Sequence, residues 1–279
     1  MARDRKDAYV DKTIHGMNNI LIDFVPKRND GAVYMNAKVD VTEFCKFIDN
    51  LKKEHPGITY FHGMSFIIGK AIYSKPLLNR FIANRTCYVH KDVSIAFTAK
   101  TEFKDEAIEY LTVQKIEPDE NLIDLSNKLK KKVDAIRNSK SEGGANDLID
   151  KIGLAPKPIR RIVTGFVMWL DRHGWLPKSL MDGNLYYSSC IVSNIGTFKV
   201  GAIYHHLTDF GTSSALITFG EIKEEGKRKY MEIGYTIDER IADGFYLCKS
   251  VRLIEYMYHH PELLLEPASK KVTISENVR

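Results

Sequence analysis

The residues best suited to acid–base chemistry stand together in "YTIDERIADGFYL", residues 235–247. The first half of this stretch predicts a β-strand, and its Asp-Gly pair predicts a tight turn that leads into a helix. Glu239 and Asp243 carry carboxylates, which can accept a proton or brace a group that does. Arg240 follows Glu239, but neighbours on a strand point to opposite faces, so we expect Arg240 to pair with Asp238 instead.

Two earlier stretches offer the other groups that such a site needs. "SNIG" begins at Ser193, at the end of an apolar strand, where a hydroxyl can donate a hydrogen bond to developing negative charge. "GAIYHHLTDFGTSS" offers His205 and His206, whose imidazoles titrate near neutral pH and can act as bases. The alternative is structural: Ser193 bonds its own turn, and one histidine ring packs on Tyr204 at the surface.

The elements that position these residues are strands and helices in irregular order. A strand at 32–41 leads into a helix whose start shows a capping pattern, Asp40 with Glu43 three residues later. Apolar spacing predicts further helices around 64–72, at 119–137 and around 247–258, and further strands at 87–99, 108–116, 186–196, 214–223 and 229–239. This order predicts an α+β two-layer sandwich, a mixed sheet with helices on one face, rather than a doubly wound sheet.

We expect the 279 residues to form a single domain with an atypical insert at about 150–185. The polar, Gly-rich stretch 138–147 is the best linker candidate. The insert is apolar and basic, with a broad apolar helical face and three cations, Lys157, Arg160 and Arg161, at one end. Such a helix packs on the core or on a neighbouring subunit; the alternatives are a membrane-surface helix and a lid over a hydrophobic substrate.

Composition narrows the class of protein. With 44% hydrophobic and 28% charged residues the chain has ordinary globular composition. Its net charge of +5 is too diffuse to indicate nucleic acid, but it mildly favours an anionic ligand such as a phosphate-bearing cofactor. The four cysteines form no CxxC pair, no secretory signal is visible, and no apolar run approaches the roughly 20 residues that span a bilayer. We therefore expect a cytoplasmic protein.

The motifs together resemble the catalytic domain of dihydrolipoyl acyltransferases, the core of 2-oxo acid dehydrogenase complexes, and of chloramphenicol acetyltransferase. The family strand often reads Asp-His-Arg-x-x-Asp-Gly; Asp238, Arg240 and Asp243-Gly244 match it, and Glu239 stands at the histidine position. The family also shows Ser-Asn-Leu-Gly about fifty residues earlier, where this chain has "SNIG".

The first half resembles the family as well, through "VDVTEF", "SFIIGKAIYSKPLLNRF" and "YVHKDVSIAF". The resemblance covers roughly residues 15–140 and 186–265, whereas the insert has no counterpart in the family. Lipoyl and subunit-binding domains are missing, so we do not expect a core subunit of a dehydrogenase complex.

The resemblance implies a homotrimer with active sites between subunits. Coenzyme A or an acyl-CoA would enter one end of a channel as substrate, and a small-molecule acyl acceptor the other. The serine matching Ser193 stabilises the oxyanion in the family, and Asp243 matches a position that braces the loop and the base. Asn194 and Gly196 belong to the same motif and are the expected coenzyme A contacts. We expect no metal and no tightly bound cofactor.

Glu239 raises the question of the base. A thiol has a pKa of about 8.5 and a glutamate about 4.3, so proton transfer to Glu239 is uphill by roughly 6 kcal/mol. Burial between subunits would raise the pKa of Glu239 and close most of that gap. Alternatively, His205 or His206 is the base, or the site binds an acyl-CoA without turnover and the protein is a ligand-binding or scaffold trimer.

Overall fold

A six-stranded mixed sheet forms the centre of the protein, in a computed structural model that describes residues 3–100, 109–138 and 152–274. The strands lie in the order β2-β9-β8-β7-β5-β6. They are β2 (Ala32–Asp40), β5 (Val93–Lys100), β6 (Glu109–Ile116), β7 (Cys190–Asn194), β8 (Ala215–Glu225) and β9 (Arg228–Asp238). Only the β5–β7 and β7–β8 pairs are parallel among the described strands.

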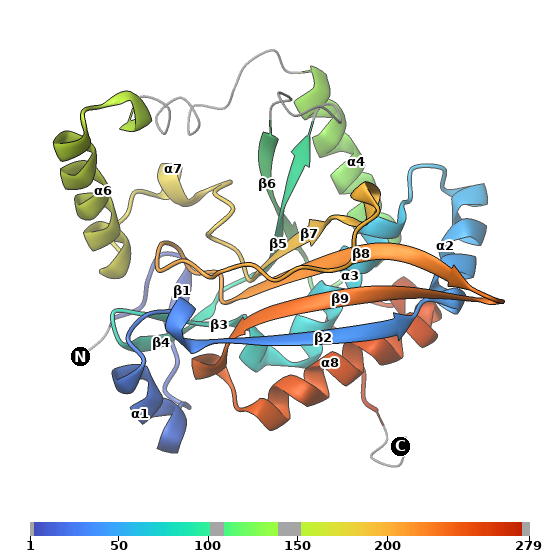
Figure 1. The fold of residues 1–279 in the computed structure, drawn as a ribbon, viewed down its shortest axis with the longest axis horizontal. Coiled ribbons are helices and arrows are strands. Elements are labelled where there is room, and N and C mark those ends of the chain that lie inside the picture. Colours follow the sequence, from blue (N-terminus) through green and yellow to red (C-terminus); the bar gives the residue numbers. More distant parts are fainter. Residues whose placement is uncertain (1–2, 101–108, 139–151, 275–279) are drawn as a thin grey trace.

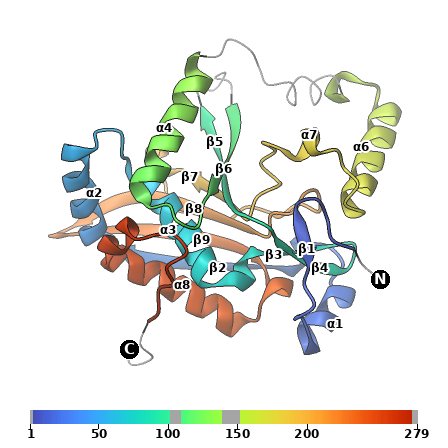
Figure 2. The same ribbon diagram turned by 180° about the vertical axis from the view of Figure 1, so that it is seen from behind.

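Helices cover one face of this sheet (Figures 1 and 2). They are α2 (Thr42–Glu54), α3 (Tyr60–Ser74), α4 (Leu122–Asn138) and α8 (Gly244–His259). Helix α3 is buried on nearly all sides, which explains its almost continuous apolar sequence. The predicted α+β two-layer sandwich is therefore confirmed.

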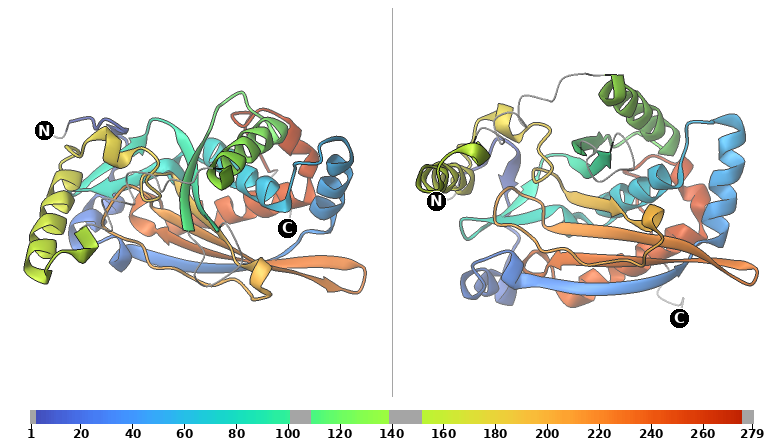
Figure 3. Two further views of the ribbon diagram at one scale, coloured as in Figure 1. Left: turned by 90° about the horizontal axis from the view of Figure 1, so that it is seen from above. Right: turned by 45° about the horizontal axis from the view of Figure 1, so that its top comes forward.

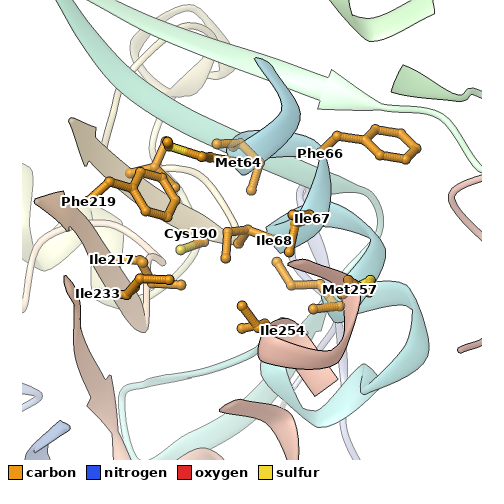
Figure 4. Packing of buried hydrophobic residues seen from close by; sticks show 14 of the residues in the cluster. Met64, Phe66, Ile67, Ile68, Cys190, Ile217, Phe219, Ile233, Ile254 and Met257 are labelled. Atoms are coloured by element: carbon orange, nitrogen blue, oxygen red, sulfur yellow. The ribbon is translucent and has the colours of Figure 1, made fainter. Parts of the chain in front are cut away.

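The core lies between the sheet and the helices α3 and α8. Figure 4 shows Ile68 of α3 and Ile254 of α8 beside Ile217 and Ile233, which belong to β8 and β9. Side chains alternate along a strand. Residues next to these core positions, such as Thr218 after Ile217 on β8, therefore point to the opposite face of the sheet. That second face carries the residues of the candidate site.

A small sheet that the sequence did not predict stands beside the large one. It has the order β1-β4-β3, formed by β1 (Ala8–Val10), β3 (Arg80–Ala83) and β4 (Thr86–His90). The single strand predicted at 87–99 is wrong: the chain leaves the small sheet after β4 and enters the large sheet as β5. Asn79 fixes the corner, because its side-chain Nδ2 donates to the carbonyls of His90 and Asp92.

Helix boundaries also differ from the prediction. The N-cap of α2 is Val41, and Asp40 instead accepts hydrogen bonds from the backbone N–H and hydroxyl of Thr42. The helix predicted from 119 begins at Leu122, after Asn121. Helix α1 (Gly16–Phe24) was not predicted. The linker candidate lies outside the described residues apart from its first position.

The insert forms α6 (Lys157–Arg172) and α7 (Lys178–Met181), at one edge of the molecule beside the small sheet (Figures 1 and 3). Within the described ranges, no helix is both long and apolar enough to cross a membrane.

Candidate active site

Glu239 lies in a short 3₁₀ turn, η4 (Glu239–Ile241), directly after β9. The sequence had suggested that strand alternation puts Glu239 and Arg240 on opposite faces. This reason does not apply, because both residues lie in the turn rather than in the strand. The expected pairing of Arg240 with Asp238 is nevertheless confirmed, with Nε–Oδ1 and Nη2–Oδ2 distances of 2.8 and 2.7 Å. Arg240 and Asp238 are buried, whereas Glu239 is half-buried and its carboxylate makes no hydrogen bond or ion pair within the described chain.

The turn that carries Glu239 is held from two further directions. Arg240 donates from Nη1 to the carbonyl of Val25, 2.8 Å away, which ties the turn to the segment after α1. The carboxylate of Asp238 also accepts from the backbone N–H of Arg240 at 3.2 Å. The backbone around Glu239 is thus fixed by buried contacts while its side chain is available for chemistry.

Asp243 is the N-cap of α8. Its exposed Oδ1 accepts a hydrogen bond from the backbone N–H of Tyr246 at 2.8 Å, which satisfies one of the unpaired donors at the helix start. This supports the bracing of the loop, but Asp243 makes no hydrogen bond or ion pair with Glu239 in the described structure. Any effect on the base is therefore through the backbone of the loop.

Ser193 lies near the end of β7 and points away from the helices. Its neighbour Val192 is buried in the core, and Ser193 stands beside Thr218 of β8 on the opposite face. The Ser193 hydroxyl is half-buried and makes no hydrogen bond in the described part of the chain. The structural alternative, in which it bonds its own turn, is therefore not observed.

Asn194 and Gly196 shape the turn after β7. Asn194 accepts at Oδ1 from the backbone N–H of Gly196, 3.2 Å away. A Cβ on Gly196 would lie 2.4 Å from the carbonyl oxygen of Gly220, so only glycine allows this close approach to β8. These contacts give both residues a structural role, and their proposed contact with coenzyme A stays a prediction.

The loop that carries His205 and His206 crosses the same face of the sheet. Thr218 donates its hydroxyl to the carbonyl of Ile203 at 2.5 Å, and the backbone N–H of His205 donates to the Thr236 hydroxyl at 3.4 Å. The loop therefore lies over β8 and β9, between the level of Ser193 and the end of β9.

His205 is the better placed of the two histidines for accepting a proton. Its Nε2 is buried and has no hydrogen-bond partner among the described residues. Burial, and to a lesser extent the neighbouring His206, lower the pKa of His205, so its ring is neutral near pH 7. His206 is exposed. Tyr204 packs edge-to-face on Tyr34, with ring centroids 5.4 Å apart, rather than on a histidine ring.

Ser193 and Glu239 are well separated within one chain: Ser193 is level with the middle of β9, whereas Glu239 lies just beyond its C-terminal end. The register places Ser193 level with Thr218 and Gly234, and Glu239 follows five residues after Gly234. At roughly 3.4 Å per residue, this separates the two by about 17 Å along the strand direction alone. One copy of the chain therefore does not bring the two predicted catalytic groups together.

Arg28 organises the end of the histidine loop, and apart from the polar run "PKRND" no sequence pattern indicates this role. This buried guanidinium donates to the carbonyls of Thr208, Ile82 and Gly211 at 2.8–3.1 Å. Its backbone N–H donates to Asp209. Within the described ranges, no three His, Cys, Asp or Glu side chains come together as they would around a metal ion.

Comparison with solved structures identifies the fold. A truncated catalytic core of the 2-oxoacid dehydrogenase complex from Thermoplasma acidophilum matches with a TM-score of 0.58 and 17% identity, over 89% of this chain and 97% of that one. A dihydrolipoamide acetyltransferase from Azotobacter vinelandii gives 0.57 and 13%, over 91% and 94%. A chloramphenicol acetyltransferase gives 0.57 and 12%, over 90% and 99%.

No protein-family model and no curated protein matches the sequence. The chain thus has the fold of chloramphenicol acetyltransferase and of the acyltransferase catalytic domains, as the resemblance in sequence had indicated.

Proposed function

We propose that this protein is an acyltransferase that moves an acyl group between coenzyme A and a small acceptor, at a site shared by two copies of a homotrimer. The observation that carries the proposal is the position of Ser193 and Glu239. Each presents a polar group without a partner in the described chain, and the strand register keeps the two apart within one copy. An arrangement of copies in which one supplies Ser193 and the next supplies Glu239 would complete a site.

Exposed apolar residues on the same face of the sheet support such an assembly. Val200, Ile203 and Tyr204 of the loop, and Tyr34 of β2, are each 45–50% exposed. Large apolar groups gathered on one face mark contact surfaces between proteins. The homotrimer would bury them next to the site.

In the reaction, Glu239 accepts the proton of the acceptor hydroxyl or thiol as its oxygen or sulfur attacks the thioester carbonyl of an acyl-CoA. The carbonyl oxygen becomes an oxyanion, to which the Ser193 hydroxyl donates a hydrogen bond. The intermediate collapses with cleavage of the carbon–sulfur bond. The coenzyme A thiolate then takes back the proton from Glu239.

The base in this scheme depends on the neighbouring copy. A second copy would cover the half-buried carboxylate of Glu239 and exclude water from the site. His205 is the competing candidate, because its neutral ring has an unpartnered buried Nε2 on the same face.

Mixing two inactive variants tests the shared site. Ser193→Ala and Glu239→Gln should each lower the rate of thiol release from acetyl-CoA or longer acyl-CoAs by about 100-fold or more, measured over a panel of alcohol, amine and thiol acceptors. When both are unfolded and refolded together in equal amounts, random assortment gives about a quarter of the sites both intact residues, so activity returns.

Refolding each variant alone is the control. Absence of recovery in the mixture, with both variants folded and trimeric, would contradict the shared site. No turnover in the parent with any donor, although coenzyme A binds, would favour a ligand-binding or scaffold protein.

A further inference from the structure

Helix α6 presents a continuous stripe of large apolar side chains to solvent. The stripe consists of Ile159, Ile162, Phe166 and Trp169, which follow one another at helical spacing and are 45–73% exposed. The half-buried Val163, Val167 and Leu170 lie on the neighbouring face of the same helix. The rest of the chain thus covers only part of the apolar surface of α6 and leaves the stripe exposed.

The helix is anchored to the body at its C-terminal end. Asp171, the buried residue near this end, accepts hydrogen bonds from Arg5 Nη2 at 3.3 Å, Tyr187 Oη at 2.5 Å and the backbone N–H of Gly211 at 2.9 Å. Figures 1 and 3 show the rest of α6 along the outer edge of the molecule. The anchoring contacts leave the stripe facing outward.

Aromatic residues continue the stripe beyond the helix. Trp175 is 59% exposed and packs edge-to-face on Trp169, with ring centroids 5.2 Å apart. Phe166 and His173 also pack on Trp169. Trp169 and Trp175 are the two tryptophans of the chain. Both therefore stand at one exposed apolar surface, where an indole has one apolar side and a polar N–H.

Every exposed charge of 157–178 is positive. The cations are Lys157, Arg160, Arg161, Arg172 and Lys178. The one carboxylate in this range, Asp171, is buried and paired with Arg5. The surface thus combines an apolar stripe with basic residues around it, which is the composition of helices that lie in the headgroup region of anionic membranes.

We propose that α6 and Trp175 bind the surface of an anionic lipid membrane, with the apolar stripe inserted among the headgroups and the basic side chains on lipid phosphates. A second copy of the chain fits this surface less well. Two copies meeting through the same stripe would bring two sets of uncompensated positive charges together. An anionic bilayer supplies both apolar contact and opposite charge.

Tryptophan fluorescence tests the proposal directly, because both tryptophans report on this surface. Addition of phosphatidylglycerol–phosphatidylcholine vesicles to the full chain should shift the emission to shorter wavelength, and brominated lipid should quench it. Pure phosphatidylcholine vesicles should bind at least tenfold more weakly, since each basic residue contributes about fivefold to binding. Sodium chloride should weaken the binding.

Two variants and a matched control locate the contact. Ile162→Ser with Phe166→Ser should abolish vesicle binding in co-sedimentation, and Arg160→Gln with Arg161→Gln should weaken it about 20-fold or more. Phe24→Ser removes an aromatic side chain that is more exposed than Phe166 but lies on α1. It should leave binding unchanged, and circular dichroism should show all variants folded.

Three results would overturn the proposal. One is an emission spectrum that anionic vesicles do not change. Another is undiminished binding by Ile162→Ser with Phe166→Ser. The third is a shift that grows with protein concentration in the absence of vesicles, because that result would assign the stripe to contact between copies.

Discussion

Asp238 and Arg240 hold the turn of Glu239 between them, through a two-pronged ion pair with an N–O distance of 2.7 Å at its shortest. Their side chains are 0% and 2% exposed, so the pair is shielded from solvent. Glu239 is the residue between them in the chain. Its backbone position therefore depends on a buried contact to which its own side chain does not contribute.

Loss of one partner of this pair should destabilise the fold. Asp238→Asn leaves the guanidinium of Arg240 buried without a counter-charge, and we expect a loss of about 3–5 kcal/mol in the free energy of unfolding. Urea denaturation measures it. The exposed pair of Lys38 and Glu225 gives the control: Lys38→Met should leave the free energy of unfolding nearly unchanged, because solvent screens this pair. Equal effects of the two substitutions would show that burial does not matter here.

Substitutions at Glu239 and His205 should identify the base. Glu239→Gln should lower kcat by about 10²–10⁴-fold, because the amide has nearly the same shape but cannot accept the proton. Glu239→His should retain or raise activity with thiol acceptors, and the acid limb of the pH–rate profile should move. His205→Ala should retain most of the activity. The reverse pattern, with His205→Ala inactive and both Glu239 variants active, would assign the base to His205.

Asp243 should matter for stability by a predictable amount. Asp243→Ala removes the cap of α8 and should cost about 1 kcal/mol, whereas Asp243→Asn should keep most of it, because asparagine caps as well. Thermal unfolding gives the stability, and kcat for the same variants shows whether the loop also positions Glu239. A fall in kcat for the folded Asp243→Ala variant, reversed in Asp243→Asn, would support positioning.

Gly196 should not tolerate a side chain. In Gly196→Ala the new Cβ would meet the carbonyl of Gly220, so the turn after Ser193 must shift; we expect a loss of about 1–3 kcal/mol and reduced kcat. Gly165→Ala is the matched control, because nothing lies within 4 Å of its Cβ. There alanine should stabilise α6 by up to about 1 kcal/mol. Similar losses for both would contradict the steric reason.

Acid should destabilise the protein through a buried histidine. Burial lowers the pKa of His62 to about 4, and its Nδ1 lies 2.8 Å from the hydroxyl of Ser126. The unfolded chain, with an ordinary histidine pKa of about 6.5, takes up the proton first. The contribution of neutral His62 to the free energy of unfolding is therefore fully present above about pH 6.5. It is lost as the pH drops towards about 4, and the loss is roughly 3 kcal/mol at most.

Urea unfolding across this pH range measures the effect. The quantity to compare is the slope of the free energy of unfolding against pH. Burial also lowers the pKa of His90 to about 4, so His90 adds to this slope in the parent protein. His62→Gln should reduce the slope by about one proton, and the exposed His15→Gln should not change it. Identical slopes for the parent and His62→Gln would show that His62 is not responsible.

The long elements could be predicted from sequence because their periodicity follows their burial. Alternation in 32–41 and apolar spacing around Met64 and Leu247 give β2, α3 and α8 in the structure. The small sheet was missed because β1 has three residues and β3 four, too short to show a period. The break between β4 and β5 depends on Asn79, a contact across the fold that no local pattern shows.

The candidate site was predictable in its members but not in its geometry. The motifs identified Ser193 and Glu239, and the pairing of Arg240 with Asp238 was correct. The end of β9 was placed one residue too late, because the buried ion pair, rather than strand propensity, ends the strand. The separation of Ser193 from Glu239 follows from strand order and register, which sequence spacing does not encode.

The pairing of β2 with β9 has a consequence for how the chain folds. The register joins Ala32 to Asp238 and Asp40 to Tyr230, so the strand of this sheet that is made first waits for the strand that is made last. During synthesis, β2 leaves the ribosome with an unpaired edge, and the edge of β8 stays open until β9 has been made. Such non-local pairing slows folding. Until β9 is in place, the unpaired backbone groups of β2 and β8 can form hydrogen bonds with strands of other chains.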